Sequence, residues 1–218
     1  MTPRAVIFDC DGVLVDSEQA AFDILQQDFA RHGLPLPRAE LEALFIGGTV
    51  KGLWQQARSM GATLPDDWVD DFYVRLYARL ALGTPLIPGI EAVLDALDAA
   101  GIPYAVGSNG SDHKMQVTLG QHPALLARLK GRLFSGQTLG KPKPAPDLYL
   151  HAASALGHRP QDCVVIEDSA TGARAARAAG IRCFGYAAHG DGAALKAAGA
   201  HTFSSMADLP GLLGLPPA

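Results

Sequence analysis

The sequence predicts an α/β fold, a doubly wound parallel sheet that carries a helical insertion after its first strand. Four short apolar runs, rich in Val, Ile, Tyr or Phe, have the character of strands buried on both faces; they span residues 5–8, 102–106, 164–166 and 181–186. Helical patterns alternate with the later runs. This order predicts parallel strands joined by right-handed crossovers, with helices on both faces of the sheet.

The insertion begins directly after the first strand, which is expected at residues 5–8. From about residue 17 to residue 82 the sequence has helical stretches and no convincing strand, and apolar side chains recur at every fourth residue in Trp68, Phe72, Leu76 and Leu80. Pro85, Pro88 and Gly89 then mark the return to the core. We therefore expect a discontinuous core domain, residues 1–15 and 84–218, and a helical cap domain, residues 16–83.

The remaining core helices are predicted by apolar stripes that end at glycines. In the segment 90–100, Val93, Leu94 and Leu97 share one face, and Gly101 follows. A second helix is expected over 147–156, before Gly157. No internal repeat or low-complexity tract interrupts this alternation.

Composition narrows the classes of partner. Lys and Arg total 18 against 22 for Asp and Glu, so the net charge is -4, which argues against a surface that neutralises nucleic-acid phosphates. The cysteines are three and lack CxxC spacing, so neither a disulfide framework nor a zinc site is indicated. The apolar run near the N-terminus is interrupted by Asp9 and is too short for a signal peptide or a membrane span. We expect a cytoplasmic protein, a monomer or small homo-oligomer, that acts on a small molecule.

Acidic residues follow the first predicted strand, and they are the sharpest chemical signal. Asp9 and Asp11 stand where that strand ends, which in an open parallel sheet is the edge where ligands bind. Gly12 makes a tight turn plausible. Two carboxylates this close repel each other unless a cation or a raised pKa relieves the repulsion. Taken alone, the pair would more often be a turn or a helix cap.

Complementary polar groups follow the other predicted strands. Ser108 and Asn109 come after the strand at 102–106, and their hydroxyl and amide can donate hydrogen bonds to phosphoryl oxygens. Glu167 and Asp168 come after the strand at 164–166 and can complete an oxygen-rich Mg²⁺ site. Between these strands lies a proline-rich loop with two lysines, Lys141 and Lys143. Each segment alone reads as a turn, a cap or a solvated linker.

Together, these segments resemble the four ordered motifs of the haloacid-dehalogenase-like phosphohydrolases. The motifs are Asp9-Cys10-Asp11-Gly12, Ser108-Asn109, Lys143-Pro144-Ala145-Pro146-Asp147 and Glu167-Asp168-Ser169. They span most of the chain in the expected order. The segments DGVLVDS and KPAPD are similar to those of the helical-cap branch, which includes β-phosphoglucomutase and the sugar-phosphate phosphatases. Within that branch, Ser108-Asn109-Gly110, Lys114-Met115 and Phe134-Ser135-Gly136 look most like bacterial 6-phosphogluconate-type phosphatases.

The resemblance implies a Mg²⁺-dependent phosphatase that passes through a phospho-aspartyl intermediate. Asp9 would be the nucleophile and Asp11 the general acid and base. Mg²⁺ would be held by Asp9, Asp168, Glu167 and the backbone carbonyl of Asp11. Lys143 would supply the remaining positive charge, and Ser108 and Asn109 would orient the phosphoryl group. The substrate would be a small phosphomonoester, such as a sugar phosphate or a sugar-acid phosphate like 6-phosphogluconate.

Two choices follow from the details of these motifs. Lys141 competes with Lys143 because each lysine precedes a proline in one loop; the family's KPAPD spacing favours Lys143, and Lys141 is expected to be solvated. The cap is expected to act as a lid, and Thr49 and Lys51 are candidates for contacting the substrate, although an exposed loop explains them equally well.

Three alternative activities remain. A mutase like β-phosphoglucomutase is disfavoured, because such enzymes usually carry a serine–arginine pair in the cap loop where this chain has Gly47-Gly48-Thr49-Val50-Lys51. Dehalogenation is disfavoured because Asp11 provides an acid that halide displacement does not need. A phospho-accepting receiver module is more remote, since receivers lack a helical insertion after the first strand. The motifs define the phosphoryl chemistry and leave the leaving group open.

Overall fold

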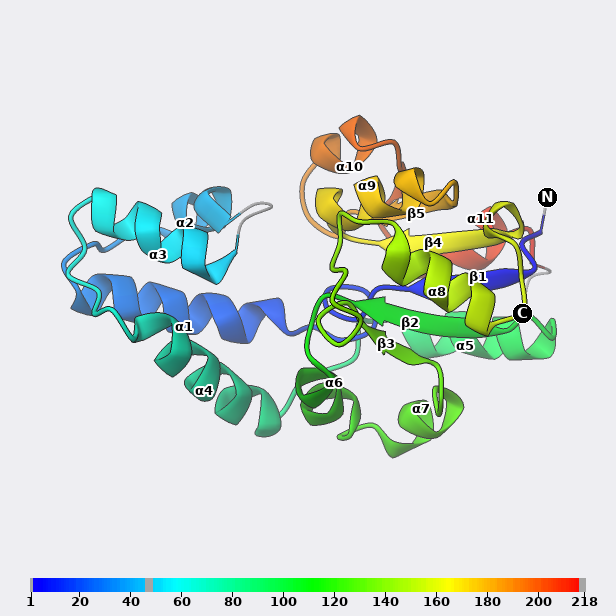
Figure 1. Cartoon of the computed structure of the whole chain (residues 1–218), viewed down its shortest axis with the longest axis horizontal. Helices are drawn as coiled ribbons and strands as arrows, with labels where there is room; N and C mark the ends of the chain where they lie inside the picture. The colour runs from blue at the N-terminus through cyan, green and yellow to red at the C-terminus, as the bar shows by residue number, and fades with distance from the viewer. Residues whose placement is uncertain (1, 46–48, 216–218) are drawn as a thin grey trace. The chain divides into compact units, whose positions relative to one another are not determined.

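Six parallel strands form one sheet in the computed structural model, which describes residues 2–45 and 49–215. The strands are β1 (Ala5–Phe8), β2 (Tyr104–Ser108), β3 (Leu133–Ser135), β4 (Cys163–Glu167), β5 (Arg182–Tyr186) and β6 (His201–Phe203). Their order is β3-β2-β1-β4-β5-β6, and every pairing between neighbours is parallel (Figure 1). The first strand of the chain therefore lies inside the sheet, between β2 and β4.

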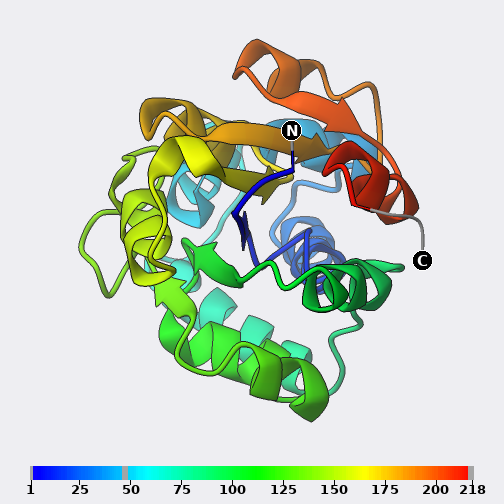
Figure 2. The same ribbon diagram turned by 90° about the vertical axis from the view of Figure 1, so that its right-hand side faces the viewer.

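Helices cover both faces of this sheet because successive residues of a strand point in opposite directions. Val6 and Phe8 of β1 belong to one apolar cluster, with residues of α5 (Ile90–Ala99), α6 (Asp112–Leu119), α7 (Pro123–Arg128) and α11 (Leu209–Leu212). Ala5 and Ile7 belong to a second cluster, with residues of α8 (Asp147–Ala155), α9 (Ala170–Ala178) and α10 (Ala193–Ala197). In Figure 2, α5 (green) and α11 (red) lie to one side of the strands and α8 (yellow-green) to the other. The predicted doubly wound fold is confirmed.

Two differences from the predicted sheet concern its edges and its strand ends. β3 and β6 were not predicted; each has three residues, of which only Ser135 and Phe203 are buried, so neither forms an apolar run. Ser108 and Glu167 were expected just after their strands, whereas each is the last residue of its strand, β2 or β4. The pairing of these ends with β3 and β5 extends both strands to the polar residue.

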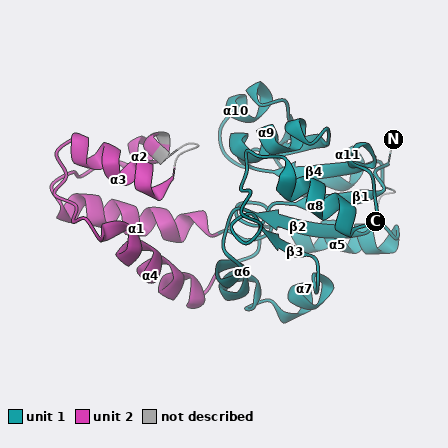
Figure 3. Cartoon of the chain, viewed as in Figure 1, with its two compact units in different colours: residues 1–16, 85–218 teal, residues 17–84 magenta. Residues whose placement is uncertain are grey.

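The chain divides into two compact units, residues 1–16 with 85–218 and residues 17–84, shown in teal and magenta in Figure 3. The second unit is the helical insertion between β1 and β2, as predicted. It contains α1 (Glu18–Arg31), α2 (Arg38–Phe45), α3 (Val50–Ser59) and α4 (Trp68–Ala81). Phe29, Trp68 and Phe72 pack together inside it, and the Trp68 indole N–H donates to Asp28 at 2.9 Å. Arg75 pairs with the same carboxylate at 2.6 Å, so the buried charge is neutralised.

Candidate active site

The loop after β1 turns back on itself and holds Asp9 at the carboxyl ends of the central strands. The backbone N–H groups of Leu14 and Val15 both donate to the carbonyl oxygen of Cys10, at 2.9 and 3.1 Å. Gly12 has a positive φ of 74°, which favours glycine. A Cβ at Gly12 would lie 2.0 Å from Oδ2 of Asp168. The absence of a side chain there allows the loop to approach Asp168, which follows β4.

Lys143 lies buried between two carboxylates at the carboxyl ends of β1 and β4. Its ammonium donates to Oδ1 of Asp9, and to Oε1 of Glu167 at 2.7 Å. Asp9, Lys143 and Glu167 are exposed by only 7, 6 and 0 %. Because an unpaired charge is costly to bury, these three groups depend on one another. The structure therefore brings together residues that come from three distant segments of the chain.

One ammonium for two buried carboxylates leaves the two acids in different states. Burial raises the pKa of Asp9 to about 7, against the charge of Lys143, and the charges of Glu167 and Asp11 act in the same direction as burial. Burial also opposes the ionisation of Glu167, but Lys143 and Ser169 hold the pKa of its carboxyl below the usual value. Glu167 thus keeps its negative charge, whereas ionisation of Asp9 is opposed. A further cation beside Asp9 would favour its ionised form.

The carboxylate of Glu167 is held by four hydrogen bonds. Oε1 accepts from Lys143 and from the hydroxyl of Tyr149 at 2.9 Å, and Oε2 accepts from the backbone N–H and the hydroxyl of Ser169 at 2.7 and 2.8 Å. Four donors match the roughly four lone-pair positions of a carboxylate. The metal-binding role expected for Glu167 stays a prediction; in this structure its carboxylate also accepts a hydrogen bond from the Lys143 ammonium. Tyr149 was not predicted as a site residue, because in the sequence it looks like an ordinary apolar position of α8.

Asn109 lies beside Lys143, at the start of the loop that follows β2. Its amide oxygen accepts from the backbone N–H of Lys143 at 2.8 Å, and its amide nitrogen donates to the backbone carbonyl of Lys143 at 3.1 Å. Both polar atoms of the Asn109 side chain are therefore engaged with the lysine loop. Its predicted contact with a phosphoryl group stays a prediction.

Ser108 is the last residue of β2 and is 1 % exposed. Its hydroxyl oxygen accepts from the backbone N–H of Gly110 at 2.9 Å. A Cβ at Gly110 would lie 3.2 Å from this oxygen and 3.6 Å from Oδ2 of Asp11. The Ser108 hydroxyl is thus close to the Asp9–Asp11 loop, where the phosphate-binding role was predicted.

Asp11 pairs with a residue that had no predicted role. The Lys114 ammonium, from the first turn of α6, lies 2.8 Å from Oδ1 of Asp11. Burial alone would lower the pKa of Lys114, but the Asp11 carboxylate raises it above its ordinary value. The sequence marked Lys114 only as part of the resemblance, because nothing in its spacing connects α6 with the loop after β1.

Asp9, Glu167 and Asp168 form an acidic cluster that could hold a metal ion. One carboxylate oxygen of each lies within 4.8 Å of the others. Opposite ligands of a Mg²⁺ octahedron are about 4.2 Å apart, so small side-chain movements would close the set on one ion. Oxygen-only donors suit a hard cation. Burial first, and then the charges of Glu167 and Asp11, raise the pKa of Asp9, and a bound cation would lower it again. The residues present therefore fit a divalent metal.

Other predicted positions take less part in this cluster. Lys141 is exposed, in contrast to Lys143. Burial raises the pKa of the Cys10 thiol well above its usual value, which favours the protonated, weakly nucleophilic form. Gly47 and Gly48 of the cap loop lie outside the described residues. Thr49 caps α3 by accepting from the Gly52 N–H at 3.0 Å, and Lys51 is exposed.

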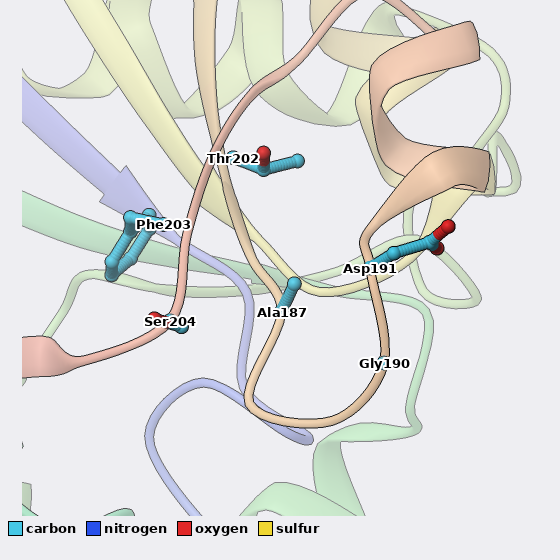
Figure 4. Close-up of a pocket in the computed structure, with 6 residues that line it drawn as sticks. All are labelled: Ala187, Gly190, Asp191, Thr202, Phe203 and Ser204. Atoms are coloured by element: carbon cyan, nitrogen blue, oxygen red, sulfur yellow. The ribbon is translucent and has the colours of Figure 1, made fainter.

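A hollow of about 150 Å³ lies where β5 and β6 end. Figure 4 shows the residues that line it: Ala187, Gly190, Asp191, Thr202, Phe203 and Ser204. None of them belongs to the acidic cluster.

Within residues 2–45 and 49–215, no helix has the length and apolar character needed to cross a membrane.

Comparison with known proteins places this geometry in a family. The family model described as "haloacid dehalogenase-like hydrolase" matches residues 3–180. The 6-phosphogluconate phosphatase of Escherichia coli K12 is 32% identical over 96% of this chain and 94% of its own length. A phosphoglycolate phosphatase of Xylella fastidiosa is 31% identical, over 87% of this chain and 84% of its own.

Solved structures agree with the family match. The crystal structure of a hydrolase of this family from Deinococcus radiodurans R1, with bound phosphate and sodium, is 36% identical and superposes with a TM-score of 0.85. The alignment covers 100% of this chain and 99% of that one. With the insertion between β1 and β2, these matches show that the chain belongs to the haloacid dehalogenase-like hydrolases, in the branch with a helical cap.

Proposed function

We propose that this protein is a Mg²⁺-dependent phosphatase that hydrolyses a small phosphomonoester through a phospho-aspartyl intermediate on Asp9. One observation carries the proposal: Lys143, Asp9 and Glu167 are buried together beside Asp168, where the central strands of the sheet end. A phosphoryl group brings further negative charge. A site that already joins a nucleophilic carboxylate, a lysine and a metal-binding cluster is suited to accept it.

The proposed roles of the chain's residues come from the motifs of the family, and the positions described above are compatible with them. An oxygen of Asp9 would attack phosphorus and displace the alcohol of the substrate. Asp11 would protonate the leaving oxygen, and would then take a proton from the water that hydrolyses the phospho-aspartate. Lys143 and Ser108 would bind phosphoryl oxygens. Asn109 would also do so, or would act through its hold on the Lys143 backbone.

Mg²⁺, which members of this family typically use, fits the acidic cluster. Asp9, Asp168 and the backbone carbonyl of Asp11 would hold it, and Glu167 would add a ligand only by exchanging one of its four hydrogen bonds. When bound, the ion would neutralise charge on the phosphoryl oxygens. Residues 17–84 would form the cap domain, and residues 1–16 with 85–218 the core domain.

The proposed substrate class is a phosphorylated sugar or sugar acid, such as 6-phosphogluconate. Its support is the likeness to relatives named for phosphorylated carboxylic acids, 6-phosphogluconate and phosphoglycolate. Identities of about 30% leave the individual substrate open, since one fold serves many leaving groups.

A phosphate-release screen tests the proposal. The purified protein is incubated with Mg²⁺ and a panel of sugar phosphates, sugar-acid phosphates, alditol phosphates and phosphoglycolate, with Asp9→Asn as the blank. We expect inorganic phosphate in stoichiometric yield from at least one member, and none from the variant or with EDTA. An isomeric sugar phosphate in place of inorganic phosphate would support a mutase. Activity of Asp9→Asn equal to that of the wild type would refute the mechanism.

A further inference from the structure

Tyr149 is a fully buried tyrosine whose hydroxyl reaches the charged centre of the site. It lies on α8, is 0 % exposed, and donates to Oε1 of Glu167 at 2.9 Å. The same oxygen accepts from Lys143 at 2.7 Å. The Lys143 ammonium also lies 4.8 Å from the centre of the Tyr149 ring, within the range of a cation–π contact. Tyr149 thus touches both members of the Lys143–Glu167 pair.

The surroundings hold the ring and the carboxylate in place. A Cβ at Gly107 of β2 would lie 3.3 Å from two carbon atoms of the Tyr149 ring, and a Cβ at Gly172 of α9 would lie 1.6 Å from Oε1 of Glu167. Two glycines therefore provide the space that these side chains fill. Burial keeps the pKa of the Tyr149 hydroxyl well above its usual value, so the group is a neutral donor.

The charges explain why this donor matters. Lys143 is shared between Asp9 and Glu167. A carboxylate oxygen that accepts a second hydrogen bond attracts the ammonium less strongly, because two donors share the negative charge of one oxygen and each hydrogen bond stabilises part of that charge. Without the tyrosine hydroxyl, Oε1 of Glu167 would draw Lys143 toward itself and away from Asp9.

We propose that Tyr149 is a positioning residue, which fixes Oε1 of Glu167 and thereby keeps the Lys143 ammonium available to Asp9 and to the phosphoryl group. This inference rests on the proposed phosphatase function. Tyr149 does not contact the reacting atoms. Its effect on the rate is transmitted through Glu167 and Lys143.

Tyr149→Phe tests the inference, because it removes the hydroxyl and keeps the ring. Tyr104→Phe is the matched control: Tyr104 is 2% exposed, and its hydroxyl oxygen accepts from Arg128 at 2.9 Å, outside the acidic cluster. We expect Tyr149→Phe to lower kcat about tenfold and to change KM less than about threefold. Tyr104→Phe should leave both within about twofold. Thermal unfolding in metal-free buffer should show that both variants are fully folded at the assay temperature, which would separate positioning from folding.

A double-mutant cycle with Glu167→Gln locates the effect. If Tyr149 acts through Glu167, the double variant should have the kcat of Glu167→Gln within about twofold. A wild-type kcat for Tyr149→Phe, or a double variant whose loss is the product of the two single losses, would overturn the inference. Those results would leave the phosphatase function standing, provided that the wild type releases phosphate and Asp9→Asn does not.

A second pair of replacements covers the case in which Tyr149→Phe fails to fold. Position 149 then receives 4-aminophenylalanine, which keeps a hydrogen-bond donor, or 4-methylphenylalanine, which has a similar size and no donor. We expect the amino side chain to retain most of the wild-type kcat and the methyl side chain to lose about tenfold. Equal kcat values for the two proteins would overturn the inference.

Discussion

Asn109 binds both backbone groups of Lys143, accepting from its N–H at 2.8 Å and donating to its carbonyl at 3.1 Å. The two residues are 34 positions apart in the sequence. A side-chain amide that pairs in this way fixes the residue from both sides, because the N–H of Lys143 belongs to the rigid peptide plane before the residue and its carbonyl to the plane after it. The place of the Lys143 ammonium therefore depends on β2 as well as on its own loop.

Asn109→Ala should lower kcat by roughly tenfold to a hundredfold, since two hydrogen bonds worth about 0.5–1.5 kcal/mol each no longer hold the lysine loop. Steady-state phosphate release is the measurement. Gln137→Ala is a suitable control, because the Gln137 amide donates to the backbone oxygen of Asn109 at 3.1 Å from an exposed position. Equal kcat values for the two variants would show that the hydrogen bonds of Asn109 do not position Lys143 for turnover.

Replacement of the two lysines should have unequal effects. Lys143→Ala removes the only ammonium that the described structure places between Asp9 and Glu167, and should lower kcat at least about a hundredfold. Lys141→Ala removes an exposed charge and should leave kcat within about twofold. Both rates are measured by phosphate release at saturating substrate. Similar losses for the two variants would contradict the assignment of Lys143.

Binding of Mg²⁺ should depend on pH through Asp9. The pKa of this carboxyl, raised to about 7 mainly by burial, means that it is mostly protonated at pH 6 and mostly ionised at pH 8. A metal ligand must lose its proton, so Mg²⁺ affinity should fall up to about tenfold for each pH unit below 7 and level off above it. Calorimetric titration in buffers of different ionisation enthalpy should detect proton release at pH 6 and little at pH 8. Asp9→Asn should lose this dependence; a flat affinity for the wild type would count against a raised Asp9 pKa.

Gly172→Ala should impair both stability and turnover, although alanine favours a helix over glycine by about 1 kcal/mol. Its Cβ would lie 1.6 Å from Oε1 of Glu167, so the carboxylate or α9 must move. Thermal unfolding followed by circular dichroism should show a lower midpoint, and kcat should fall with it. Gly211→Ala in α11 is the control, because no atom lies within 4 Å of its added Cβ. A stabilised and fully active Gly172→Ala would contradict the contact.

The central strands could be predicted from sequence because they are buried on both faces. Val6, Phe8, Ala5 and Ile7 are all fully buried, so the run that contains them is apolar throughout. β3 and β6 lie at the two edges of the sheet and have three residues each, too few for a period to be recognised. What defines them is pairing with β2 and β5, which is a property of the tertiary structure.

The site residues that directly follow strands could be predicted from the sequence. Those that depend on contacts between distant segments of the chain could not. Asp9, Ser108 and Asp168 were expected at one edge because parallel strands end there. Tyr149 and Lys114 gave no such signal, since each lies on a helix and meets its acidic partner only in the folded chain. The motif containing Asn109 was visible in the sequence, but its partner, the backbone of Lys143, was not.

The ion pair of Asp9 and Lys143 joins positions 134 residues apart, and the pairing of β1 with β4 brings in residues still farther along the chain. A ribosome-bound fragment that stops before β4 has the strand that carries Asp9 without one of its two neighbours, and it lacks Glu167 and Asp168 altogether. Contacts of such long range form late and slowly. Phosphate release would therefore require that these long-range contacts have formed. After dilution from denaturant, the rate at which activity returns would measure how fast the slowest of them forms.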